Sequence, residues 1–229
     1  MQKKLLSISV AIILLASILA IPALANVVHV DAKFNGLPIG RYENGLEPNL
    51  NRNSADREIN VVANPSGPGN VVSLLTDTPQ DSFIQAANLG AMDYSQTMTL
   101  DTKLYFADMN NEVLILFREG AGANFMYPVV FRMDGSIATS NANLTSHSVN
   151  AATNSGLTKI GEYKTGEWIK VQAQLNTTAQ TYSVWINGEQ LVTNAPLDPA
   201  SPRIDSINNL RVTASGATID TYTGPAHIF

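Results

Sequence analysis

The 229-residue chain contains no cysteine, only 3 histidines and 2 tryptophans, and charged residues make up 14% of it. Without cysteine the chain can form neither a disulfide framework nor a cysteine-ligated zinc site. No two histidines lie at ligand spacing, and a Gly-x-Ser-x-Gly elbow is absent, which leaves a zinc centre and a serine triad without support. Stability must therefore come from a packed apolar core.

Clusters of basic residues are also absent. Lysine and arginine number 14 against 19 aspartates and glutamates, which gives a formal net charge of −5. Nucleic acids and anionic lipids are bound through several neighbouring cations. We therefore expect neither nucleic acid nor a membrane surface as a partner of the mature protein.

The only long apolar run lies near the N-terminus, over residues 5–21. Lys3 and Lys4 precede it, and Ala23-Leu24-Ala25 supplies the small-x-small pattern that signal peptidase reads. The run is near the lower limit for spanning a bilayer, so an uncleaved anchor is the alternative. We predict a signal peptide over 1–25 and a secreted domain over 26–229. Loss of the two lysines takes the net charge from −5 to about −7.

Strand signals dominate the rest of the chain, and helix signals are scarce. Residues 168–175 alternate with period two, and 181–186 return from a turn and end at Asn187-Gly188. We predict hairpins from 97–106 to 112–118 and at Asp134-Gly135. Residues 136–155 read as a weak strand followed by a long loop. Further strands are predicted at 27–34, 59–63, 71–75, 125–133, 207–212 and 217–222.

Three segments share their order and content with one known fold. They are residues 32–40 (AKFNGLPIG), 166–188 (GEWIKV … QTYSVWING) and 207–220 (INNLR … ID). This order resembles the concanavalin A-like lectin/glucanase superfamily, in its LamG-like jelly-roll branch of secreted bacterial proteins. The resemblance spans nearly all of the mature chain. It implies an all-β fold, a jelly-roll β-sandwich of two stacked antiparallel sheets, one of them concave.

The catalytic signatures of that superfamily are missing. The Glu-x-Asp-x-x-Glu triplet of its retaining glucanases does not occur. Its polysaccharide lyases use arginine, glutamine, histidine and tyrosine, but their Arg-x-Glu-x-Arg and Gln-Ile-His patterns are absent here. Arg118, Arg132 and His147 are scattered candidates for such chemistry. A polysaccharide lyase or glycoside hydrolase therefore stays open as an alternative.

Aromatic and amide side chains are the candidates for sugar binding. Sugars stack their C–H faces on exposed rings, while amides and guanidinium groups satisfy the hydroxyls. Ser183, Trp185 and Asn187 share the polar face of one predicted strand. Trp168, which the resemblance places at a family tryptophan, is expected to be structural. The predicted ligand-binding residues are Trp185, Asn187, Gln172, Gln174, Arg118 and Arg132.

A structural calcium ion is the one cofactor that we consider. In jelly rolls the first and last strands lie side by side, which would bring Asp31 near Asp220 as calcium ligands. The alternative is that Asp220 caps a turn and Asp31 is a surface residue. We expect a secreted carbohydrate-binding or cell-surface module without catalysis, with a polysaccharide or cell-surface glycan as partner. A structural extracellular matrix or surface protein is the third interpretation.

Overall fold

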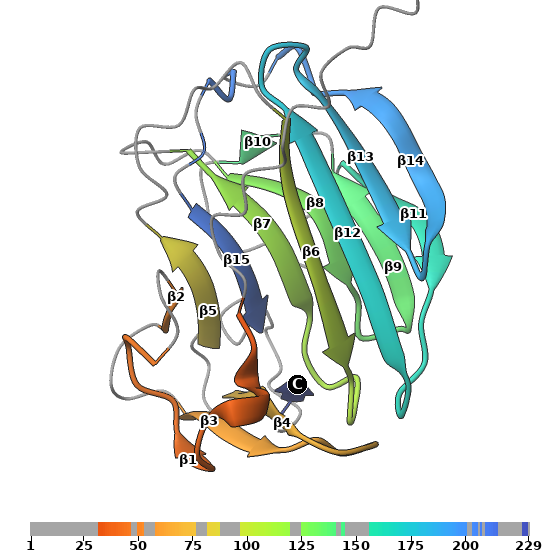
Figure 1. Cartoon of the computed structure of the whole chain (residues 1–229). Helices are drawn as coiled ribbons and strands as arrows, with labels where there is room; N and C mark the ends of the chain where they lie inside the picture. The colour runs from red at the N-terminus through yellow and green to blue at the C-terminus, as the bar shows by residue number, and fades with distance from the viewer. Residues whose placement is uncertain are drawn as a thin grey trace, which may run out of the picture.

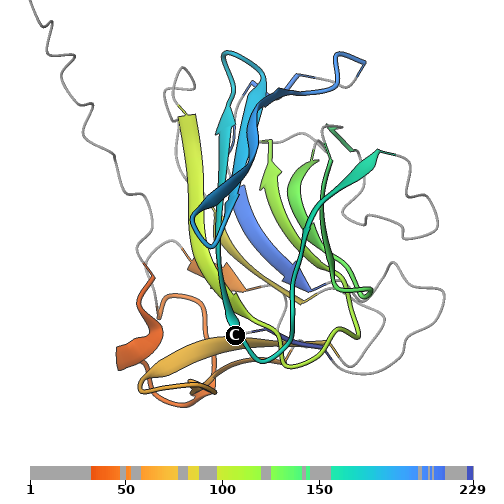
Figure 2. The ribbon, with the colours of Figure 1, turned by 90° about the vertical axis from the view of Figure 1, so that its right-hand side faces the viewer.

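The computed structural model describes most of the chain beyond residue 31. The described residues are 32–46, 50–52, 58–76, 82–87, 97–119, 125–140, 143–144, 156–200, 203–205, 207, 209–214 and 226–228. This part is almost entirely antiparallel β structure, with one short 3-10 helix, η1 (Phe34–Gly36). It contains no helix long and apolar enough to cross a membrane. The two main sheets pack face to face, which confirms the predicted all-β, antiparallel jelly-roll sandwich (Figures 1 and 2).

The smaller sheet has the strand order β14-β13-β12-β6. One inner strand, β12 (Trp168–Asn176), pairs with β6 over its whole length and with β13 over most of its length. The strands are β6 (Thr97–Tyr105), β12 (Trp168–Asn176), β13 (Thr181–Ile186) and β14 (Glu189–Pro196). Alternation decides the two faces, because successive side chains of a strand point to opposite sides. Ile169, Val171, Ala173 and Leu175 are buried in the core, and the residues between them face outward.

The larger sheet has the order β11-β9-β8-β7-β15-β5-β2. Its strands are β2 (Leu50–Arg52), β5 (Ser82–Ala87), β7 (Val113–Arg118), β8 (Phe125–Phe131), β9 (Ser136–Ser140), β11 (Leu157–Glu162) and β15 (Asn209–Ala214), and β10 (Asn143–Leu144) pairs with β8. One strand from near the C-terminus, β15, lies between β5 and β7. The strands β7 and β8 are buried on both faces, which explains why their sequences are continuously apolar.

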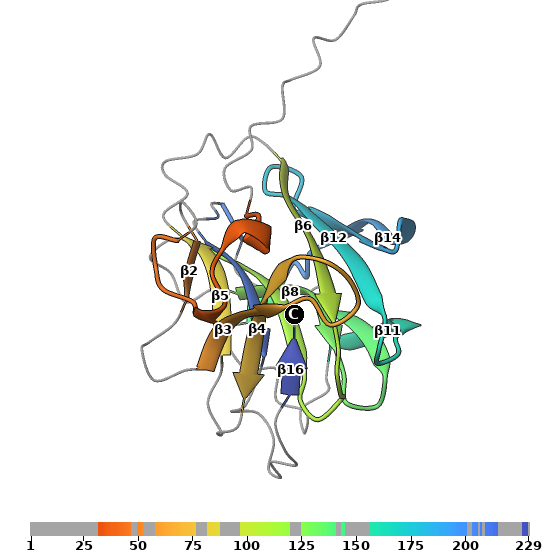
Figure 3. The ribbon, with the colours of Figure 1, turned by 60° about the horizontal axis from the view of Figure 1, so that its bottom comes forward.

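A third, unpredicted sheet closes one end of the sandwich. It has the order β1-β3-β4-β16, with β1 (Gly40–Arg41), β3 (Glu58–Ala63), β4 (Asn70–Thr76) and β16 (Ala226–Ile228). Figure 3 shows it lying across that end of the sandwich. Ile59, Val61, Val72 and Leu74 of this sheet join the same apolar core as the two main sheets. It therefore acts as a base that seals the core.

The predicted hairpin between 97–106 and 112–118 is wrong. Both strands exist, but β6 pairs with β12 in the smaller sheet, whereas β7 pairs with β8 and β15 in the larger one. The connection between them crosses from one layer to the other. It contains the buried residues Asn111 and Glu112, so it is part of the interior and not a surface turn. The hairpins at Asp134-Gly135 and Asn187-Gly188 are confirmed.

The region 136–155, predicted as a weak strand followed by a long loop, opens with a strand as expected. Residues 136–140 form the fully buried strand β9 of the larger sheet, and residues 145–155 lie outside the described residues. Of the predicted strand 27–34, only residues 32–34 are described, and Phe34 opens η1 instead of closing a strand. The predicted strand 217–222 lies outside the described residues.

Candidate functional site

The outer face of the smaller sheet brings together four of the six predicted binding residues. Gln172 on β12 lies directly opposite Trp185 on β13, which in turn pairs with Gln190 on β14. Gln174 lies one step further along the same face of β12, and Asn187 ends β13 at its turn. We call this surface, over β6, β12, β13 and β14, the outer face. It carries polar side chains and two half-buried indole rings.

A shallow hollow lies at one end of the outer face. Its volume is about 340 Å³, and it is lined by Lys103, Trp168, Lys170, Asn187 and Gly188. The strands place these residues side by side, because Lys103 on β6 lies directly opposite Lys170 on β12. The hollow therefore combines two ammonium groups, one indole and a tight turn.

Trp168 is held in place from two sides. Its ring packs against Tyr105, with a centroid distance of 5.5 Å, and Tyr105 is its direct partner across the β6–β12 pair. Its indole N–H donates a hydrogen bond to the Ser66 hydroxyl, in the loop between β3 and β4. Trp168 thus joins the base sheet to the smaller sheet, as a structural tryptophan would. One side of it nevertheless lines the hollow.

Trp185 lies in a different setting. It is half-buried on the outer face, between Gln172 and Gln190, and its indole N–H has no hydrogen-bond partner in the described part of the chain. A half-exposed ring whose N–H is not bonded within the described residues fits a sugar, which offers both an apolar face and hydroxyl acceptors. Trp185 is therefore more accessible to a ligand than Trp168, of which only one side lines the hollow.

The amide side chains differ in how free they are. Asn187 has φ of 52°, a left-handed conformation that asparagine tolerates in turns, and its Oδ1 accepts a hydrogen bond from the backbone N–H of Lys170 at 2.8 Å. Gln174 donates to the Thr99 hydroxyl at 3.3 Å across the β6–β12 pair. Asn187 accordingly shapes the edge of the hollow.

The two predicted arginines lie away from this face and from each other. Arg118 ends β7, where its guanidinium group lies 5.4 Å from the centre of the Phe125 ring. Arg132 follows the far end of β8, about 23 Å away at 3.3 Å per residue. The two arginines therefore do not meet at one point of the sheet. His147, the third candidate of the lyase alternative, lies outside the described residues.

Arg132 is engaged with a buried acid. Its Nε lies 2.8 Å from Oε1 of Glu112, whose side chain is only 1% exposed. Burial raises the pKa of Glu112, and the attraction of Arg132 lowers it by less. Tyr163 completes the cluster by donating its hydroxyl hydrogen to the backbone carbonyl of Arg132 at 2.8 Å. Burial and the nearby acids raise the pKa of Tyr163, which therefore stays protonated. This arrangement is part of the core.

The outward side of the larger sheet carries a polar chain that the sequence did not reveal. Arg211 donates to Asn209 at 3.1 Å, Asn209 donates to Gln85 at 2.8 Å, and the guanidinium group of Arg211 lies 4.2 Å from the centre of the Phe83 ring. Strand alternation alone could have placed Asn209 and Arg211 on one face. Both are nearly buried, at 6% and 5% exposure, so they offer a polymer little surface.

The predicted calcium ligands Asp31 and Asp220 lie outside the described residues, so calcium stays a prediction. Within the described ranges, no three histidines, aspartates or glutamates come together in a way that could hold a metal ion.

Comparison with known proteins gives the fold of this chain. No family model and no curated protein sequence matches it. The apo Crh5 transglycosylase aligns with a TM-score of 0.52 at 10% identity, over 87% of this chain and 85% of the transglycosylase. A sialidase aligns with a TM-score of 0.51 at 14% identity, over 79% of this chain but only 16% of the sialidase. A family 7 alginate lyase aligns less well, with a TM-score of 0.48 at 10% identity, over 73% of this chain and 77% of the lyase.

These structures define the class of fold. At such low identity the likeness establishes the fold alone, a jelly-roll sandwich. This chain spans about one sixth of the sialidase, so the activity of that larger protein does not carry over to it.

Proposed function

We propose that this chain is a secreted, LamG-like, non-catalytic module that binds a polysaccharide or cell-surface glycan along the outer face. The support comes from the side chains of that face together with the fold class, which other carbohydrate-active proteins share. The N-terminal apolar run and its Ala-x-Ala pattern support export.

One observation carries the proposal, the presence of both tryptophans of the chain on the same outer face. Trp185 lies opposite Gln172, which is four residues along β12 from Trp168. At about 3.3 Å per residue and 4.8 Å between strands, their backbones are about 14 Å apart. Two rings at that separation can stack on different units of one extended glycan chain, with Lys170 and Gln172 between them.

The polar groups around the rings suit binding better than cleavage. Gln172 and Gln190 flank Trp185 and provide donors and acceptors for sugar hydroxyls. Hydrolysis of a glycosidic bond generally needs two carboxyl groups facing it. Asp101, which lies in the same row of side chains as Gln172, is instead ion-paired with Lys170 at 3.1 Å.

Electrophoresis of residues 26–229 through gels that contain neutral and acidic polysaccharides tests the proposal, with a parallel assay for cleavage of the same panel. We expect retardation without products. Products from a uronate polymer would replace the proposal with the lyase alternative and direct attention to Arg118, Arg132 and His147. Absence of both binding and products, with self-association of the protein, would support a structural extracellular role.

The first prediction concerns Trp185. We expect Trp185→Ala to abolish glycan retention, because it removes the ring on which the sugar stacks, while Trp185→Phe keeps part of the retention. Both variants should melt within a few degrees of the wild type, since the side chain is half-exposed and lies on the outer face. Affinity electrophoresis and a thermal melt measure the two effects. Unchanged retention by Trp185→Ala would exclude Trp185 as the platform.

A further inference from the structure

The hollow contains an unfavourable pair of charges. Lys103 and Lys170 lie directly opposite each other on β6 and β12, on the same face of the sheet. Like charges at directly opposed positions destabilise a sheet. A protein with an acidic balance, 19 acids against 14 basic residues, nonetheless concentrates positive charge at this point.

Only one of the two lysines is neutralised by the protein. Lys170 pairs with Asp101, with Nζ 3.1 Å from the carboxylate oxygen. Lys103 is exposed and forms no ion pair in the described part of the chain. Its ammonium group is therefore available to an external anion.

The rest of the hollow provides shape and an apolar wall. Trp168 is fixed by Tyr105 and Ser66, so its ring holds one orientation. Gly188 has φ of +87° and no side chain, which keeps the opposite edge low. The hollow thus has an indole wall on one side and the Lys103 ammonium group on its lining.

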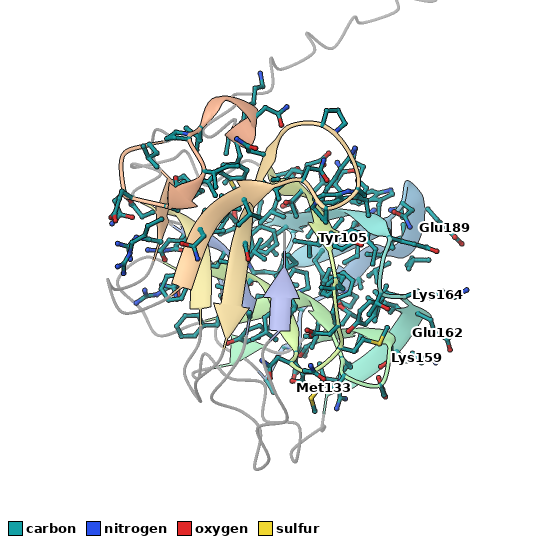
Figure 4. The ribbon with its side chains drawn as sticks, turned by 90° about the horizontal axis from the view of Figure 1, so that it is seen from below. Tyr105, Met133, Lys159, Glu162, Lys164 and Glu189 are labelled. Atoms are coloured by element: carbon teal, nitrogen blue, oxygen red, sulfur yellow. The ribbon has the colours of Figure 1, made fainter. Side chains whose placement is uncertain are left out.

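Two other exposed lysines lie in a different setting. Figure 4 shows Lys159 and Lys164 near Glu162 at the β11 side of the molecule, away from Tyr105. Lys159 is paired there with Glu162 at 2.6 Å. Lys103 therefore differs from Lys159, whose charge is paired with a neighbouring acid on the protein surface.

We infer that the hollow binds an anionic substituent, a carboxylate or a sulfate, of an acidic glycan. The anion pairs with the Lys103 ammonium group, and the sugar ring that carries it packs on Trp168. This inference rests on the proposed function and specifies its ligand class. The contact pairs a lysine ammonium group with an anion of the glycan. Binding should therefore weaken as added salt screens this attraction.

Matched polymers test the inference on the mature protein. Retardation and calorimetric affinity are compared for dextran and dextran sulfate, and for polygalacturonate and its methyl ester. We expect tighter binding to the charged member of at least one pair. The pair that shows the preference identifies the anion as sulfate or carboxylate.

The second prediction is that Lys103→Gln weakens binding of the preferred acidic polymer about 3- to 5-fold and Lys103→Glu weakens it further, in line with exposed ion pairs. Lys164→Gln is the matched control, because it removes an exposed lysine outside the hollow, and it should bind like the wild type. Retention of the neutral polymers should not change in any of these variants.

The outcomes separate this inference from the proposed function. If Trp185→Ala abolishes retention but Lys103→Gln binds acidic and neutral polymers like the wild type, the glycan-binding function stands and the anionic subsite is wrong. Absence of binding to every polymer overturns both. Equal Lys103-dependent binding to single-stranded DNA shows attraction to polyanions in general and overturns the recognition of a glycan.

Discussion

At the scale of single residues, the ion pair between Glu112 and Arg132 is the most consequential polar contact. Glu112 is buried in the connection between the two sheets, and Arg132 is the one cation beside it among the described residues. Removing one partner of a buried pair leaves an uncompensated charge. We predict that Arg132→Ala lowers the free energy of unfolding by about 3 kcal/mol at neutral pH, measured by urea denaturation. Arg203→Ala, which removes an exposed ion pair with Asp205, should cause no measurable loss.

The cost of Arg132→Ala should depend on pH in a defined direction. The pKa of Glu112 is raised above its ordinary 4.5, so the folded protein holds this proton more tightly than the unfolded chain. Such a group contributes stability that is complete below pH 4.5 and is lost as the pH rises through the folded pKa. Without Arg132 that pKa rises further, so the deficit of the variant should be small near pH 4.5 and grow toward pH 8. A deficit that stays constant over this range would show that Glu112 is not its source.

Individual residues also mark the limit of what the sequence could predict about the site. Period-two alternation correctly grouped Gln172, Gln174 and Trp185, because neighbouring strands joined by a short turn share a face. It could not separate Arg118 from Arg132, since both stand at the end of a strand run. Which end of the sheet each occupies depends on the β7–β8 pairing. The pairing of Lys103 with Lys170 could not be predicted either. The two residues lie 67 positions apart in the sequence, and only the β6–β12 pairing brings them together.

At the scale of secondary-structure elements, one hydrogen bond joins the two main sheets through the core. The Thr139 hydroxyl on β9 donates to the Tyr182 hydroxyl on β13 at 3.1 Å, and both residues are buried. We predict that Thr139→Val lowers the free energy of unfolding by about 1 to 2 kcal/mol, because it leaves the tyrosine hydroxyl unpaired. Adding Tyr182→Phe should cost little more, since no polar group then remains unsatisfied. A double-mutant cycle in urea measures the coupling, and strictly additive losses would contradict it.

The strands also show which parts of the fold the pattern of apolar and polar residues can predict. Strands with one solvent-exposed face, such as β12, were predicted with their boundaries and their hairpin partner. Strands buried on both faces, such as β7, were located but not paired, because a continuously apolar run does not specify its neighbours. The short stretch after β6 resembled a hairpin turn in sequence. In the structure it crosses to the other layer, and its residues Asn111 and Glu112 are buried.

At the scale of the whole molecule, the sequence predicts export followed by cleavage. We expect the secreted protein to begin at Asn26, because Ala23-Leu24-Ala25 fits the specificity of signal peptidase. Mass spectrometry of the protein recovered from the medium of a secreting host measures the mature terminus. Replacing Ala25 with a bulky residue such as Tyr should leave the precursor uncleaved. Recovery of the intact precursor from the wild-type sequence would favour the uncleaved anchor instead.

The position of β15 has a consequence for the order in which the chain can fold. This strand lies between β5 and β7, yet it begins 91 residues after β7 ends at Arg118. Until residues 209–214 have left the ribosome, β5 and β7 each keep an unpaired edge, and the larger sheet cannot close. Pairings across such long separations also slow folding. A nearly complete chain must therefore be present before the larger sheet can reach its final form.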